Sequence, residues 1–123
     1  MIGSIVLDLS HSAGNPRNSE GAFATLSNGQ LIYAYSRYNG DSWSDHASAD
    51  IAARYSDDGG KTWTGEDRIL VENEGVCNVM SVSLLRLQDG RLALFYLRKN
   101  GLLDCRPQLR TSDDDGKTWS DPV

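Results

Sequence analysis

The sequence contains the segment Ser56-Asp-Asp-Gly-Gly-Lys-Thr-Trp63 and, 56 residues later, the nearly identical segment Ser112-Asp-Asp-Asp-Gly-Lys-Thr-Trp119. Both follow the pattern S-x-D-x-G-K-T-W. A second pair of similar segments precedes them, residues 26–37 and residues 87–98, at an offset of 61 residues. The chain is therefore built from a repeated unit, and the first copy has five more residues between its paired segments than the second.

Each repeat predicts short β-strands separated by turns. In the first unit we expect strands at residues 21–26, 31–38, 51–55 and 68–71; in the second, at residues 79–87, 92–97 and 108–111. Asn28-Gly29 and Asp89-Gly90 are expected to form two-residue hairpin turns. Because no helix-length amphipathic stretch is present, we predict an all-β fold. A four-stranded unit that repeats every ~40 to 60 residues is typical of a β-propeller, so the chain is expected to form about two four-stranded blades.

The repeats also predict a division of the chain. Residues 1–14 are expected to contain a leading strand, at residues 2–9, that pairs with the last blade and closes the ring. Residues 15–72 are expected to form the first blade and residues 73–123 the second. Because repeat units bury their faces against neighbours, the two blades are expected to need the remainder of the propeller as a partner.

The repeated S-x-D-x-G-K-T-W segments are interpreted as structural turns. Asp58 and Asp114 are expected to accept backbone N–H bonds within their own turn, while Gly60 and Gly116 adopt a left-handed conformation. The full structural set is Ser56, Asp58, Gly60, Thr62, Trp63, Ser112, Asp114, Gly116, Thr118 and Trp119, with both tryptophans folding back onto the sheet. The segments lack the ligand pattern of an EF-hand loop, so no metal and no cofactor is predicted.

Composition excludes several classes of function. The 123 residues carry 12 basic and 17 acidic side chains, a net charge of −5, which argues against nucleic acid as a partner. No apolar stretch is long enough to span a membrane, and no signal peptide is visible, so no membrane partner is expected. Cys77 and Cys105 match no metal or redox spacing; they are predicted to be two buried thiols, and a disulfide between them is the alternative.

At the repeated segments the chain resembles the sialidase superfamily, whose Asp boxes, or BNR repeats, have this pattern. The resemblance covers Arg17 to Val123. It implies a six-bladed propeller that hydrolyses terminal α-linked sialic acid, with a glycan carrying an acidic sugar as substrate. Since a complete propeller needs roughly three times as many residues, the resemblance also implies an N-terminal fragment.

Blade topology separates the scaffold from the expected site. In an up-and-down blade, the turns that contain the Asp boxes share one end of the blade with the hairpin turns, and the other connections share the opposite end. The expected site therefore comprises residues 15–20, 37–50, 74–80 and 98–106.

The resemblance implies three arginines that bind the substrate carboxylate, an aspartate acid/base, and a tyrosine nucleophile supported by a glutamate. Asp45 lies in the longer loop of the first unit, 11 residues before Ser56, and is the predicted acid/base. Trp43 and His46 flank Asp45 and are expected to favour its protonated form. Asp41 and Asp50 are competing candidates. The alternative is that Asp45 is a solvated turn residue.

Arg17 matches the position of the first carboxylate-binding arginine, although the sequence there reads Arg-Asn-Ser instead of Arg-Ile-Pro. The further substrate-binding candidates are Glu20, Arg37, His46, Asn78, Arg98 and Arg106. For Arg37 and Arg98 a structural role at the strand end remains the alternative, and for Arg106 an ion pair with Asp104. Tyr33, Tyr35, Tyr38, Tyr55 and Tyr96 are assigned to strand packing, so the nucleophile is expected beyond Val123.

We therefore predict an exo-acting glycoside hydrolase that resembles exo-α-sialidases and releases sialic acid or a related acidic sugar, and we expect this chain alone to be inactive. Two alternatives remain open. One is a non-catalytic Asp-box propeller that binds glycans or proteins, because a fold does not fix a function. The other is a related glycosidase with a different sugar specificity.

Overall fold

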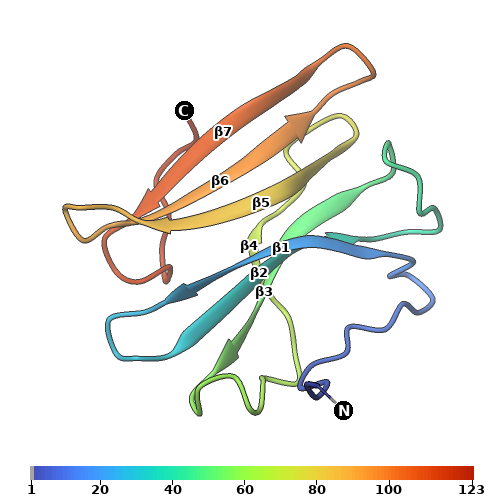
Figure 1. Ribbon diagram of the computed structural model, residues 1–123. Helices are drawn as coiled ribbons and strands as arrows, with labels where there is room; N and C mark the ends of the chain where they lie inside the picture. Colours follow the sequence, from blue (N-terminus) through green and yellow to red (C-terminus); the bar gives the residue numbers. More distant parts are fainter. Residues whose placement is uncertain (1) are drawn as a thin grey trace.

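The computed structural model describes residues 2–123, which form two antiparallel sheets and no helix (Figure 1). The first sheet contains β1 (Asn18–Thr25), β2 (Leu31–Tyr38), β3 (Ala49–Ser56) and β4 (Arg68–Val71), in that order. The second contains β5 (Asn78–Arg86), β6 (Leu92–Lys99) and β7 (Cys105–Ser112). The all-β prediction is confirmed, and each repeat forms one blade-like sheet.

Strand β7 begins earlier than the sequence suggests, because Pro107 does not interrupt it. The N–H groups of Leu109 and Thr111 point away from β6, to the Val123 carbonyl oxygen at 2.9 Å and Ser120 Oγ at 3.0 Å. Pro107 lies two residues before Leu109 in the same strand, so its nitrogen also faces away from β6. The missing N–H of the proline therefore costs no hydrogen bond to β6. The same bonds place residues 120–123 beside β7. This position is equivalent to that of β4 beside β3 in the first sheet.

The two hairpin turns are longer than predicted. Leu26 N–H donates to Gln30 O and Gly29 N–H donates to Leu26 O, so three residues form the loop. Only the glycine has a positive φ, 86° at Gly29 and 90° at Gly90. The expectation of a two-residue Asn-Gly or Asp-Gly turn was therefore wrong: Asn28 instead accepts a side-chain bond from the Gln30 N–H at 3.0 Å.

The core lies between the two sheets. Strand β5 packs across β1, β2 and β3, and the buried apolar cluster draws on both sheets. From the first sheet come Ile32, Ala34, Ile51, Ala53 and Val71; from the second come Val79, Val82, Leu84, Leu92, Leu94 and Tyr96. A bulge at Ser81, with φ 57°, directs its N–H onto the fully buried Ser36 Oγ at 3.0 Å. The sheets are thus joined by apolar packing and by a buried hydrogen bond.

Each Asp box is a self-contained hydrogen-bonded turn. Ser56 Oγ accepts the Gly60 N–H and donates to Asp58, both at 2.9 Å, and Asp58 accepts the Thr62 N–H and hydroxyl at 2.9 and 2.6 Å. The second copy repeats these bonds through Ser112, Asp114, Gly116 and Thr118. Gly60 and Gly116 have φ of 88° and 80°, as expected. Trp63 packs against the rings of Phe23 and Tyr33, and Trp119 packs against the core.

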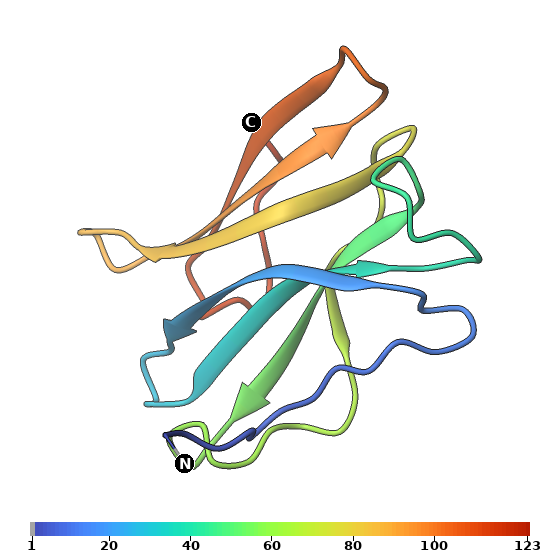
Figure 2. The ribbon, with the colours of Figure 1, turned by 45° about the vertical axis from the view of Figure 1, so that its right-hand side comes forward.

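The segment before β1 does not form the expected strand. Within residues 2–14 the only pairing is an isolated bridge between Ser12 and Asn15, so residues 2–9 join neither sheet in this structure. They run along the outer side of the first sheet (Figure 2) and enclose with it a cavity of about 550 Å³. The pairing of this segment with a last blade stays a prediction.

The two thiols are free, but the prediction that both are buried was wrong. Cys77 is half-buried and Cys105 is exposed. Cys105 is the first residue of β7, next to the solvent-facing loop at residues 100–104, which leaves its side chain open. Within residues 2–123 no helix is long and apolar enough to cross a membrane.

Replacement of Ser56 by alanine should destabilise the fold. Ser56 is 2% exposed, and its loss leaves the Gly60 N–H without its acceptor, which costs about 1–3 kcal/mol. Urea unfolding of Ser56→Ala measures this cost. The exposed Ser83 in β5 provides the matched control, and Ser83→Ala should change the free energy of unfolding by less than about 0.5 kcal/mol. Equal stability of the two variants would contradict the role of the Asp box.

The Asp boxes should also make stability depend on acid pH. Hydrogen bonds from Thr62 and Thr118 lower the pKa of Asp58 and Asp114 from 3.8 to about 2. A carboxyl with a lowered folded-state pKa stabilises the fold above its unfolded pKa, and this contribution is lost as pH falls toward the folded value. The free energy of unfolding should therefore fall between about pH 4 and pH 2. Asp58→Asn should flatten this dependence, whereas Asp41→Asn should leave it unchanged.

Candidate functional site

The connections of the two sheets separate into two ends, as the topology predicted. The hairpin turns and the Asp boxes lie at one end, toward the left and bottom of Figure 1. Residues 39–48, 72–77 and 100–104 gather at the other end, together with residues 12–17 (Figures 1 and 2). We call this second end the loop end. It brings together connections from both sheets.

An ion pair between Arg17 and Asp45 lies at the loop end. Arg17 Nη1 donates to Asp45 Oδ1 at 2.5 Å and to the Trp43 carbonyl oxygen at 3.2 Å. The guanidinium carbon lies 4.6 Å from the centre of the Tyr38 ring, a cation–π contact. Two residues singled out in the sequence, 28 positions apart, are thus in direct contact.

The backbone of Arg17 is fixed by Asn15 and Tyr38. Asn15 Nδ2 donates to the Tyr38 carbonyl at 2.7 Å and to the Arg17 carbonyl at 3.2 Å, and the Tyr38 N–H donates to the Arg17 carbonyl at 2.9 Å. Asn15 is buried. Both residues lie within the ranges expected for the site, but the sequence did not indicate their role in holding Arg17: Tyr38 was assigned to strand packing, and Asn15 was not singled out. The result is an arginine held at the end of β2.

The loop that carries Asp45 is held by the second sheet. Asn78, the first residue of β5, donates from Nδ2 to the carbonyl oxygens of Asp45 and Ala47 at 2.9 and 2.8 Å. Its side chain is fully buried. Asn78 was expected to bind substrate, but its amide donors are occupied by the loop and closed to solvent. The structure therefore places Asn78 behind the loop of Asp45, with both amide donors occupied, and its contact with substrate stays a prediction.

The environment of Asp45 favours the ionised form. The hydrogen bond and the charge of Arg17 lower the pKa of Asp45, and the charge of Lys99 adds to the effect. The Asp45 side chain is 61% exposed, and Trp43 is 78% exposed instead of forming an apolar wall. The expectation that Trp43 and His46 favour a protonated Asp45 was therefore wrong in this state of the site. Lys99 ends β6 beside Asn78, and no sequence pattern singled it out.

The competing aspartates have other environments. Asp50 is the second residue of β3. It accepts hydrogen bonds from Asn39 Nδ2 at 2.7 Å and from the Asn73 N–H at 2.9 Å. These bonds tie β3 to the neighbouring connections. Asp41 is exposed in the same loop as Asp45. Asp45 is thus the carboxylate of this loop that contacts an arginine.

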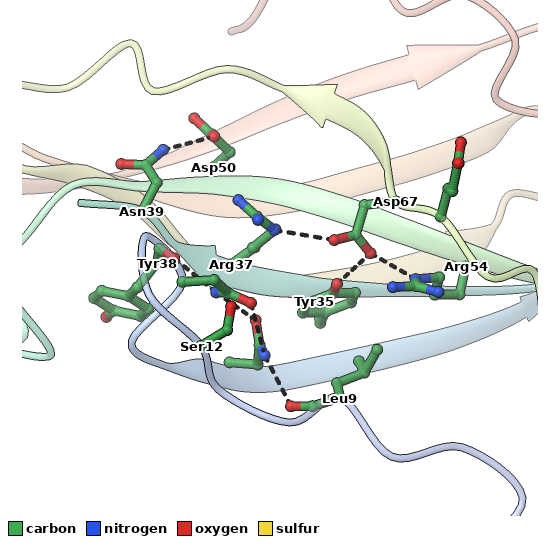
Figure 3. A network of polar contacts seen from close by, with 12 residues as sticks. Leu9, Ser12, Tyr35, Arg37, Tyr38, Asn39, Asp50, Arg54 and Asp67 are labelled. Atoms are coloured by element: carbon green, nitrogen blue, oxygen red, sulfur yellow. Dashed lines mark hydrogen bonds and ion pairs between the residues drawn. The ribbon is translucent and has the colours of Figure 1, made fainter. Parts of the chain in front are cut away.

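Arg37 takes part in a network of polar contacts centred on Asp67 (Figure 3). Arg37 Nε and Arg54 Nε donate to the two carboxylate oxygens of Asp67 at 3.0 and 2.6 Å, and the Tyr35 hydroxyl also donates to Asp67. These contacts support the structural alternative for Arg37. Its assignment as a substrate-binding residue is not supported by its position.

The remaining candidates are dispersed. Arg106 is exposed and pairs with Asp104 at 2.6 Å, and His46 is exposed on the Asp45 loop. Glu20 is exposed on β1 and accepts a hydrogen bond from Ser19 at 2.7 Å. Arg98 lies at the end of β6, where its Nε is buried without a hydrogen-bond partner among the described residues. Of these four, only His46 shares the loop of Asp45.

A second Tyr–carboxylate–Arg cluster lies at the junction of the sheets. The Tyr96 hydroxyl donates to Glu74, and Arg110 donates to Glu74 at 2.7 Å and to the Tyr96 oxygen at 3.0 Å. Burial and the Glu74 hydrogen bond raise the pKa of Tyr96 to about 12. Burial is also the first cause of a raised pKa at the other tyrosines: Tyr33, Tyr35, Tyr38 and Tyr55. The two carboxylate oxygens of Glu74 are thus both occupied, one by the Tyr96 hydroxyl and the other by Arg110.

A cleft of about 570 Å³ opens beside the ion pair, between the segment before β1 and the first sheet. Its lining includes Arg17 and Trp43 from the site and Asp8 and His11 from the N-terminal segment. Within residues 2–123 no group of three or more His, Cys, Asp or Glu side chains is placed to hold a metal ion. The polar and aromatic groups that line the cleft are the Arg17 guanidinium, the Asp8 carboxylate, the His11 imidazole and the exposed indole ring of Trp43, and Asp45 adjoins the cleft through its contact with Arg17.

Removal of the Arg17 charge should raise the pKa of Asp45. In Arg17→Met the carboxylate loses its hydrogen bond and its nearest positive charge, so protonation becomes easier. An NMR titration of the side-chain carboxyl groups measures the shift. Arg106→Met is the matched control, because it removes the ion pair with Asp104 and should leave the titration of Asp45 unchanged. An unshifted Asp45 in Arg17→Met would contradict the ion pair.

Comparison with known proteins places this geometry in context. No protein-family profile matches the chain. The chain is 34% identical over 115 residues to a protein described as "Sialidase" from Paraclostridium sordellii, a match that covers 80% of this chain and 28% of the relative. The chain thus spans less than a third of the length of that curated relative.

Solved structures share the fold. A protein of unknown function from Dyadobacter fermentans superposes with a TM-score of 0.76 at 19% identity, over 92% of this chain and 37% of that one. The Hadza microbial sialidase Hz136 superposes with a TM-score of 0.70 at 20% identity, over 89% of this chain and 26% of that one.

Proposed function

Because this chain belongs to the sialidase superfamily, we propose that it carries part of the active site of an exo-acting glycoside hydrolase that releases sialic acid or a related acidic sugar. The observation that carries the proposal is the Arg17–Asp45 ion pair beside an open cleft at the loop end. A cation for a substrate carboxylate and a carboxyl for proton transfer are the two groups that such a reaction requires of this region.

Arg17 is the proposed carboxylate-binding group. Its guanidinium is held over the Tyr38 ring and its backbone is fixed by Asn15, so it is oriented before a ligand binds. A guanidinium binds a carboxylate through two parallel hydrogen bonds. The carboxylate of an acidic sugar therefore competes with Asp45 for the same cation.

This competition prepares Asp45 for its proposed role. Once a substrate carboxylate takes Arg17, Asp45 loses the contact that lowers its pKa and gains a negative neighbour, and both changes favour its protonated form. The protonated carboxyl then donates its proton to the glycosidic oxygen as the bond to the leaving group breaks. In the second step the resulting carboxylate accepts a proton from the attacking water.

The other catalytic groups of the reaction are not assigned to residues of this chain. The family resemblance implies a tyrosine nucleophile, its glutamate and further arginines. The five tyrosines of the chain lie within strands β2, β3 and β6 and are assigned to packing, so we assign the nucleophile to the part of the propeller that this chain does not include. The chain alone is accordingly expected to be inactive.

One observation favours a second candidate function. The partner of Arg17 is a largely exposed carboxylate, which an anionic ligand can displace reversibly without any catalytic step. A non-catalytic propeller that binds acidic glycans would use the same Arg17 contact. It would not need Asp45 as a proton donor.

Kinetics on the complete propeller distinguish these functions. Asp45→Ala should reduce turnover of substrates with poor leaving groups by about 10²- to 10⁴-fold, and that of aryl glycosides with good leaving groups far less, because only poor leaving groups need the proton. Asp41→Ala, in the same exposed loop, is the control and should retain activity. Equal losses on both substrate classes would exclude the acid role. A wild-type protein that binds acidic sugars without turnover would support the binding module.

A further inference from the structure

We propose that Asn78, at the start of the second sheet, is the positioning residue that holds the backbone of Asp45 in place while its carboxylate exchanges partners. The inference rests on the proposed function, since it assigns Asn78 a role in preparing Asp45. It replaces the expectation that Asn78 binds substrate.

The orientation of this amide is fixed by its partners. Nδ2 faces two carbonyl oxygens, those of Asp45 at 2.9 Å and Ala47 at 2.8 Å, and donates one hydrogen to each. A rotated amide would set its own oxygen against both carbonyls. Oδ1 is buried and has no hydrogen-bond partner among the described residues. The side chain therefore leaves its acceptor unsatisfied while both donors serve the loop.

At its base the loop is closed by the hydrogen bond from the Asn39 N–H to the Ser48 carbonyl oxygen at 3.0 Å, and its other side-chain attachments are weaker than Asn78. Arg17 contacts Trp43 and Asp45, but through exposed atoms, and Asn73 Nδ2 reaches the Ser48 hydroxyl at 3.3 Å. Exposed ion pairs contribute little to holding a segment, because water and salt compete for both partners. The fully buried Asn78 is shielded from this competition. It is the attachment that persists when the ion pair opens.

The proposed chemistry needs a fixed Asp45 backbone together with a carboxylate that can change partners. A carboxylate that leaves Arg17 must then meet the glycosidic oxygen within hydrogen-bond distance, and displacement of a catalytic group by about 1 Å can cost about 10²-fold in rate. Asn78 fixes the Asp45 carbonyl and leaves the carboxylate free to rotate. Because Asn78 belongs to the second sheet, the packing of one sheet on the other sets the position of Asp45.

The test uses Asn78→Leu and Asn78→Ala, which remove both donors without adding charge. Each should increase amide hydrogen exchange of residues 45–47 at least 10-fold relative to the core strands, and should raise the pKa of Asp45 toward its usual value because contact with Arg17 is lost. Arg17, Lys99 and His46 are the positive or titratable groups near Asp45 and are unchanged in both variants. Ser112→Ala, a buried polar group at the opposite end of the same sheet, is the matched control for lost stability.

These readouts need no substrate, so they remain informative if the proposed hydrolase activity fails. Loop exchange and an Asp45 titration that stay as in the wild type, in whichever Asn78 variant folds, would overturn the proposal. If both Asn78 variants unfold while Ser112→Ala folds, Asn78 is a core residue and the proposal also fails. In the complete propeller, Asn78→Ala should lower kcat at least 10-fold with little change in KM. A change in KM alone would indicate direct substrate contact and contradict the positioning role.

Discussion

Packing of the second sheet onto the first is the constraint on which the rest of this structure depends. Each sheet is a single layer and cannot bury its apolar face alone. Strand β5 lies across three strands of the first sheet, and the shared core includes Ile32, Ile51 and Val82. The same strand begins at Asn78, beneath the loop of Asp45. One interface therefore forms the core and assembles the loop end.

Although the chain has a net negative charge, its arginines stabilise the fold through ion pairs with carboxylates. All seven ion pairs found among residues 2–123 use arginine as the cation. Arg86 joins Asp115 of the second Asp box to the Thr25 carbonyl of the first sheet, and Arg110 joins Glu74 to Tyr96. The contacts of Arg86 join the two sheets, and those of Arg110 attach the connection between β4 and β5 to the second sheet. The Arg17–Asp45 pair differs because it lies beside an open cleft and its carboxylate is largely exposed.

Local pattern predicted much of the fold. The bounds of β2 and β4 and the hydrogen bonds of the Asp boxes follow from the repeats, since they depend on residues close in sequence. Other features depend on partners that a local pattern does not reveal. Pro107 is tolerated because its nitrogen faces away from β6, and residues 2–9 form no strand because no strand of the described sheets pairs with them. The start of β7 was therefore mispredicted, while the pairing of residues 2–9 with a last blade stays a prediction.

The sequence by itself determined the repeated unit, the all-β fold and the end of the sheets at which the loops gather, because periodic apolar residues and turn residues act over short distances. Tertiary structure decided which side chains meet there. Asp45 pairs with Arg17, 28 residues away, and its carbonyl binds Asn78, 33 residues away in the other sheet. An exposed charged residue or an amide residue could pair with many other residues of the sequence. Only the packing of the sheets selects among them.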